Sequence, residues 1–233
     1  MAENEHLSVI QQGSEVWNKW REENRDISGP DLSGADLRQA YLRGADLRGV
    51  NLRAVKFKGA RLCEQDFRGV VDLSYADFIE ADLSGANLGG VNLKDANFFG
   101  ATLQGTNLSK ANITHGCLNS ARLNQAILRG TILIDAFVIG AHFDDADLSG
   151  ANLTRARLYE SDFSGANMQD ADLTWAVIFG IETDVRELWG ADFSLALNFT
   201  QDQIDKANLD CTKFGVCEPR LPAHLKMKKP RRS

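Results

Sequence analysis

The chain has 233 residues, of which 43% are hydrophobic and 25% are charged, with 20 glycines, 4 prolines and a formal net charge of −6. These values suit a folded chain of one or two domains, and no segment approaches the roughly 18 consecutive apolar residues that a membrane-spanning helix needs. Because the first residues also lack the basic and apolar regions of a signal peptide, we expect a cytoplasmic protein without membrane attachment.

The N-terminal segment is predicted to be helical. Leu7, Ile10, Trp17 and Trp20 recur at approximately helical spacing, and Gly13 marks a possible break between two helical pieces. Such a segment is suited to cover one end of the structure that follows. Residues 1–24 are therefore predicted to form an N-terminal helical cap.

A five-residue repeat follows the cap. From Ile27 to Ile178 a large apolar residue i recurs every five positions, with one extra residue before Leu73, and it forms the centre of 31 units. Five residues advance about 500° around a helix, so the centres would form no helical stripe. In a straight strand, successive centres would face opposite sides because five is odd. A corner in every unit resolves both problems, with positions i−2 and i pointing inward and the other three outward.

The phenylalanine centres predict how many corners make one coil. Phe78 and Phe98 are 20 residues apart, and Phe57 lies 21 residues before Phe78 across the extra residue. Phe143 and Phe163 repeat the spacing of 20. Since residues stacked on one face should resemble one another, a coil has 20 residues and four faces. Glycine is frequent at i+2, where the corners are expected.

The units GADLRGVNLR, ADLSGANLGGVNLKDANF and DADLSGANLTRARL resemble those of the pentapeptide-repeat family. The resemblance covers residues 25–200. It implies an all-β solenoid, a right-handed quadrilateral β-helix with four five-residue faces per coil, about 8–9 coils and short α-helical caps at both ends. The flanking segments also resemble those of family members from photosynthetic bacteria.

The C-terminal part departs from the repeat. Residues 181–190 keep the count of five but place Thr183 at a centre, which predicts a distorted coil or a loop. Thr200 to Gln203 form a capping-box pattern, so residues 201–233 are predicted to contain a short cap helix and a basic tail. The tail at 226–233 is interpreted as a solvated, disordered end rather than a site for nucleic acid or an acidic membrane.

No catalytic or metal-binding motif stands out. The four histidines (His6, His115, His142 and His224) are dispersed, and the repeat places His115 and His142 on different faces, so they are not expected to share a metal ion. Cys211 and Cys217 are interpreted as free thiols, with a disulfide or a metal site as the alternative. We predict no enzymatic activity, no cofactor, no metal and no small-molecule substrate.

The outward charges suggest one hypothesis for function. Aspartate and asparagine recur at i−1 in ladders along the faces, and the first 212 residues carry a net charge of −12. Some pentapeptide-repeat relatives, the quinolone-resistance proteins, are dimeric DNA-like rods that bind DNA gyrase. A DNA-mimicking rod that binds and modulates gyrase or topoisomerase is therefore the alternative hypothesis. Against it stands a basic ring near the start of the repeat: Arg38, Arg43, Arg48, Arg53, Lys56, Lys58, Arg61 and Arg68.

The outward apolar residues suggest the preferred hypothesis. One face has an apolar stripe that Asn119 interrupts. The members of the stripe lie at i+1, except for Phe137, which lies at i−1. These members are Ile79, Phe99, Phe137, Ile139, Tyr159, Phe179 and Phe199. Three alternatives for what covers the stripe are a partner protein, a second copy of the chain, and the chain's own residues 201–225. We thus predict a non-enzymatic protein-interaction scaffold with an unidentified partner, and no direct binding of nucleic acid.

Overall fold

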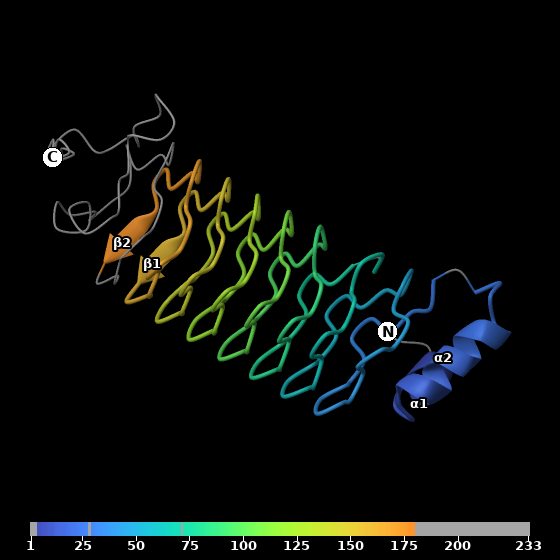
Figure 1. Cartoon of the computed structure of the whole chain (residues 1–233). Helices are drawn as coiled ribbons and strands as arrows, with labels where there is room; N and C mark the ends of the chain where they lie inside the picture. Colours follow the sequence, from blue (N-terminus) through green and yellow to red (C-terminus); the bar gives the residue numbers. More distant parts are fainter. Residues whose placement is uncertain (1–3, 28, 71, 180–233) are drawn as a thin grey trace, which may run out of the picture.

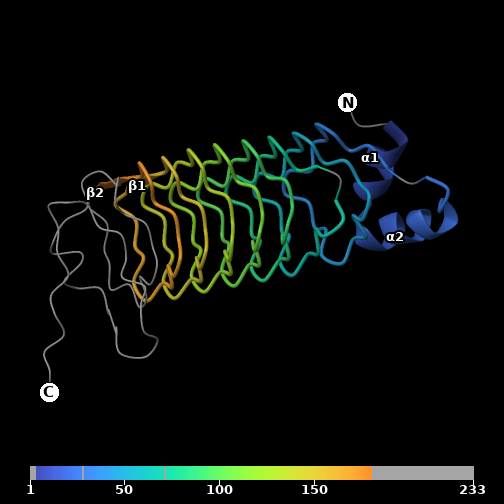
Figure 2. The same cartoon turned by 90° about the horizontal axis from the view of Figure 1, so that it is seen from above.

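The computed structural model describes residues 4–27, 29–70 and 72–179. These residues form an elongated stack of coils with two helices at its N-terminal end (Figure 1), and the view from above shows the helices beside the first coils (Figure 2). The predictions for residues 181–190, for the C-terminal cap and tail, and for Cys211, Cys217 and His224 lie outside the described residues.

The coils are joined by parallel backbone bridges on four faces. Asp77 pairs with Asn97 and Asn87 pairs with Asn107, so facing residues are 20 apart. Across the extra residue the spacing becomes 21, as in the pair Lys56 and Asp77. This register confirms the predicted coil of four five-residue faces and places the molecule among β-helix solenoids.

Most five-residue units contain a single bridged residue, because the chain turns a corner soon after it. Only two described segments are long enough to form strands, β1 (Arg157–Tyr159) and β2 (Val177–Phe179), which pair in parallel. No helix in the described ranges is long and apolar enough to cross a membrane.

The interior is filled by the residues at i−2 and i, as predicted. Alanines such as Ala96 and centres such as Leu93 and Phe98 are almost completely buried. The phenylalanine columns are also present: the rings of Phe78 and Phe98 are parallel, with centroids 4.9 Å apart, and those of Phe143 and Phe163 are 4.6 Å apart. Stacking identical residues every 20 positions therefore produces a continuous apolar core.

The corners lie at i+2, where the frequent glycines in the sequence indicated them. The residue at i+2 adopts a left-handed backbone conformation, with φ of 76° at Gly44 and 65° at Gly150. Glycine adopts this conformation without the steric cost that a Cβ atom introduces. Other residues also occupy such corners, as His115 and Trp175 do with φ of 58° and 60°.

Two helices pack against the first coils, α1 (Asn4–Ile10) and α2 (Ser14–Glu23), and Gly13 separates them with φ of 104°. Trp17 on α2 is completely buried, and its Nε1 donates a hydrogen bond to the carbonyl of Asp46 at 2.8 Å. Asn18 bonds to the same segment through both ends of its amide, accepting from the Asp46 N–H and donating to the Gly44 carbonyl. The helix thus satisfies backbone groups that a preceding coil would otherwise bond.

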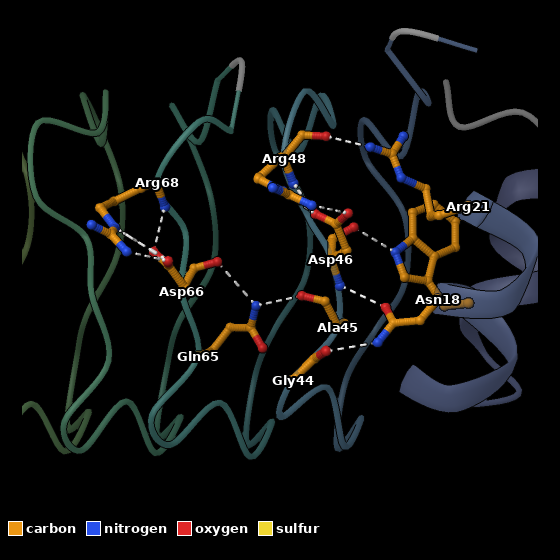
Figure 3. Close-up of polar contacts among 10 residues, drawn as sticks. Asn18, Arg21, Gly44, Ala45, Asp46, Arg48, Gln65, Asp66 and Arg68 are labelled. Atoms are coloured by element: carbon orange, nitrogen blue, oxygen red, sulfur yellow. Dashed lines mark hydrogen bonds and ion pairs between the residues drawn. The ribbon is translucent and has the colours of Figure 1, made fainter. Parts of the chain in front are cut away.

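A buried glutamine replaces a backbone bridge between two successive coils (Figure 3). Gln65 occupies an i−2 position, where alanine is usual, and its Nε2 donates to the carbonyls of Ala45 and Asp66 at 2.8 and 3.1 Å. On the other faces the equivalent carbonyls accept hydrogen bonds from backbone N–H groups, as those of Ala40 and Arg61 do. No backbone bridge joins Asp46 to Asp66, so a side chain connects the two coils on this face.

Candidate functional site

The bridges place most of the predicted apolar stripe in one column. Ile79 and Phe99 follow the bridged pair Asp77 and Asn97 by two positions, so they are neighbours on successive coils. Ile139 and Tyr159 are related in the same way through Phe137 and Arg157. The Cα of Tyr159 in turn faces that of Phe179 across strands β1 and β2. The side chain of Phe179 and the whole of Phe199 lie outside the described part.

The members of the stripe differ in exposure. Phe99 has 47% of its surface exposed and Phe137 has 36%, whereas Ile79, Ile139 and Tyr159 are half-buried. The guanidinium of Arg157 lies over the ring of Phe137, 4.7 Å from its centroid, and covers part of it. Phe99 is consequently the most exposed of the stripe side chains described.

Asn119 divides the stripe into two parts. Its Oδ1 accepts a hydrogen bond from the N–H of Ile139 at 3.0 Å, so its amide is fixed against the next coil. Ile79 and Phe99 lie on one side of it, and Ile139 and Tyr159 lie on the other. A partner that covers the full column must therefore accommodate one polar group between two apolar patches.

The ladders at i−1 have a structural role in each unit. Asp72 accepts a hydrogen bond from the N–H of Ser74, two residues on, and Asn92 on the next coil donates its amide to the same carboxylate oxygen at 2.9 Å. Asn51 donates to Asp31 in the same manner. Asparagine amides of the ladders thus form hydrogen bonds between successive coils. These carboxylates hold turns and coils together, which accounts for the recurrence of Asp and Asn along the faces.

The basic ring is largely paired with carboxylates. Arg38, Arg48 and Arg68 each bind the aspartate two residues earlier in the same unit, while Arg43 and Arg53 bind Glu64 and Asp72 on the next coil. The pairs within a unit were not foreseen from the sequence. They form because i−1 and i+1 both point outward on the same side of the unit.

These pairs lower the pKa values of their carboxyl groups. Hydrogen bonds from Arg38 to Asp36, with Nη2 and Oδ2 2.5 Å apart, lower the pKa of Asp36 to about 2. The hydrogen bonds from Arg48 and Arg68 likewise lower the pKa of Asp46 and of Asp66. Because ionisation is favoured in the folded state, these groups stabilise the fold above about pH 4, and this contribution is lost as the pH falls through their folded pKa values.

Replacing Arg38 with glutamine is expected to raise the pKa of Asp36 from about 2 toward its ordinary value of 3.8, because the charged hydrogen bonds are lost. Carboxyl chemical shifts measured by NMR during an acid titration report this pKa directly. Lys58→Gln is the matched control, since Lys58 occupies the same position one coil later. An unchanged pKa in Arg38→Gln would contradict the assignment of the ion pair.

The histidines of the repeat lie on different faces, as predicted. His115 occupies a corner at i+2, while His142 lies at i−1 on another face and bridges Asp162. His6 is a buried residue of α1, and its Nδ1 accepts a hydrogen bond from the N–H of Asp31. Cys63 and Cys117 are free, partly exposed thiols.

Comparison with known proteins agrees with this architecture. The family model of pentapeptide repeats matches residues 31–69, 76–114, 106–144 and 141–178. The chain is 28% identical to HetL, a pentapeptide repeat protein from the cyanobacterium Nostoc sp. strain PCC 7120. The match covers 78% of this chain and 91% of HetL, with a TM-score of 0.64. No curated protein is significantly similar to the chain in sequence.

Two further solved structures are similar at lower TM-scores. The pentapeptide repeat protein alr5209 from Nostoc PCC 7120 is 27% identical over 48% of this chain and 79% of its own, with a TM-score of 0.37. The plasmid-mediated fluoroquinolone resistance protein QnrB1, in a trypsin-treated form, is 19% identical over 66% of this chain and 90% of its own, with a TM-score of 0.35.

Proposed function

Because the chain belongs to the pentapeptide-repeat family, we propose that it is a non-enzymatic scaffold that binds another protein along the apolar stripe. The observation that carries the proposal is the alignment of Ile79 with Phe99 and of Ile139 with Tyr159 in one outward column. Aromatic side chains in such a position supply large contact areas at low cost in conformational entropy, and they are frequent among the residues that dominate binding energy.

The shape of the molecule supports the same proposal. A stack of identical coils presents each face as a straight, rigid row, so a partner can contact several coils without ordering a loop. The likeness to HetL, which is involved in the regulation of heterocyst differentiation, supports a regulatory rather than a metabolic setting. The ion pairs of the basic ring and the turn-forming role of the ladders do not favour a uniformly acidic, DNA-like surface.

Replacing both Phe99 and Tyr159 with aspartate is expected to weaken partner capture by at least about tenfold, because two aromatic contacts worth about 1–2 kcal/mol each are lost. Capture from native lysate, followed by quantitative mass spectrometry, compares this variant with the wild type. Size-exclusion chromatography of the same samples tests whether the partner is a second copy of the chain.

The matched control is Tyr41→Asp, which replaces an aromatic residue with 61% of its surface exposed on a different face. This variant should capture the same proteins as the wild type. Partner capture that survives the double substitution, or that Tyr41→Asp removes equally, would exclude the stripe as the interface. Circular dichroism spectra of all variants establish that the coils remain folded.

A further inference from the structure

Three ligand-type side chains meet on the face that contains His142. His142 and Asp144 are two residues apart in one unit, at i−1 and i+1, so both point outward on the same side. Asp162 is the bridge partner of His142 on the next coil. One nitrogen or oxygen atom from each of the three residues lies within 4.8 Å of the other two.

These donors suit a divalent transition-metal ion. Imidazole nitrogen and carboxylate oxygen bind such ions at about 2.0–2.2 Å, which places neighbouring ligand atoms about 3 Å apart. The three ligand atoms already lie within 4.8 Å of one another, and rotation of the side chains about their own bonds brings such atoms to this separation without movement of the backbone. The backbone register of the two coils therefore already brings the three ligands within reach of one ion.

Hydrogen bonds orient both carboxylates. Asn124, on the preceding coil, donates its amide to Oδ2 of Asp144 at 2.6 Å. The N–H of Ser164 donates to Oδ1 of Asp162 at 2.8 Å. Outer partners of this kind fix the direction of metal ligands and raise the affinity of a site.

The cluster is not a by-product of the repeat. On the preceding coils of this face, the positions equivalent to His142 hold Arg122 and Thr102. Those equivalent to Asp144 hold Asn124 and Gln104. Asp162 keeps the aspartate that is usual at i−1, as Asp82 does on the same face, so the set of one histidine and two aspartates arises where His142 and Asp144 depart from the pattern next to it.

His115 offers a contrast within the same molecule. It also lies between two aspartates, but Asp95 contacts its Nδ1 at 3.3 Å and Asp135 contacts its Nε2 at 3.7 Å. The two carboxylates are consequently on opposite sides of the ring and cannot share one ion with a single nitrogen. Asp135 is also bound by Arg155, with Nη2 and Oδ2 2.5 Å apart.

We propose that His142, Asp144 and Asp162 bind one divalent first-row transition-metal ion, with water completing its coordination. The ion would join two successive coils through ligands on each. This site lies on a different face from the apolar stripe and does not depend on the proposed protein binding.

Titration of the full-length protein with Co²⁺, followed by visible absorption and calorimetry, tests the site. Thiols are alkylated beforehand, and the absence of a sulfur-to-cobalt charge-transfer band verifies that nitrogen and oxygen are the ligands. One ion is expected to bind the wild type, and His142→Ala and the isosteric Asp162→Asn should each weaken binding by at least tenfold. His115→Ala should bind as the wild type does.

Thermal unfolding gives a second readout. Co²⁺ should raise the Tm of the wild type and of His115→Ala, because an ion that binds only the folded state stabilises it, but it should not raise the Tm of His142→Ala. Equal binding by the wild type and His142→Ala would overturn the proposal. So would loss of binding in His115→Ala, or a wild type that binds no Co²⁺.

Discussion

Replacing Phe98 with alanine is expected to lower the free energy of unfolding by about 3–5 kcal/mol, the usual cost of deleting a buried aromatic ring. Phe98 is completely buried, and its ring stacks in parallel on that of Phe78, with centroids 4.9 Å apart. Removing it leaves a cavity in a column whose other members are held by the coils above and below. Urea denaturation followed by circular dichroism measures the loss.

The neighbouring residue provides the control. Phe99 has 47% of its surface exposed, so Phe99→Ala is expected to lower the free energy of unfolding by about 1 kcal/mol or less. The two substitutions remove the same atoms from adjacent positions, and their difference isolates the inward or outward direction of the side chain. Similar losses for both variants would contradict the assignment of centres and outward positions.

Replacing Trp17 with alanine is expected to detach the N-terminal helices from the first coil. The substitution removes a fully buried indole and the hydrogen bond from its Nε1 to the carbonyl of Asp46, for a combined cost of about 3–5 kcal/mol. Since the uncovered coil presents unpaired backbone groups, the variant should also self-associate. Urea denaturation and size-exclusion chromatography measure the two effects.

Two further substitutions separate the contributions of this tryptophan. Trp17→Phe keeps most of the buried ring but loses the hydrogen bond, and should cost less than the alanine variant. Val16→Ala alters a residue of the same helix that has 42% of its surface exposed, and should change the free energy of unfolding by no more than about 0.5 kcal/mol. A Trp17→Ala protein that unfolds as the wild type does, without self-association, would show that the helices contribute little.

The coil was predictable from the sequence because its period constrains every residue in the same way. A spacing of five with small residues at i−2 leaves one arrangement of inward and outward positions, and the spacing between Phe78 and Phe98 sets the coil length. The column that contains Phe99 and Tyr159 follows from the same arithmetic. Its differences in exposure do not, since they depend on neighbours such as Arg157, which lies over Phe137.

Features that depend on exceptions to the repeat were not predictable. Gln65 occupies an inward position that favours alanine, and only the structure shows that its amide bonds to both backbone carbonyls. The grouping of His142 with two aspartates was missed because the histidines were compared with one another. A search for side chains 2 and 20 residues away from each histidine, which the coil length permits, would have found Asp144 and Asp162.

The junction at Gln65 also bears on how a rod of this kind can change in length. The segment around Asp46 is bonded through side chains on both sides, to Trp17 and Asn18 of the helix on one side and to Gln65 on the other. An additional coil inserted here would face side-chain donors and acceptors in place of the regular backbone N–H and carbonyl groups. In the coils between Asn87 and Asn167, the backbone bridges recur every 20 residues, so an added coil would find bridging groups at the same positions. The middle of the rod could therefore accept an additional coil with less disturbance of its hydrogen bonds than the N-terminal end.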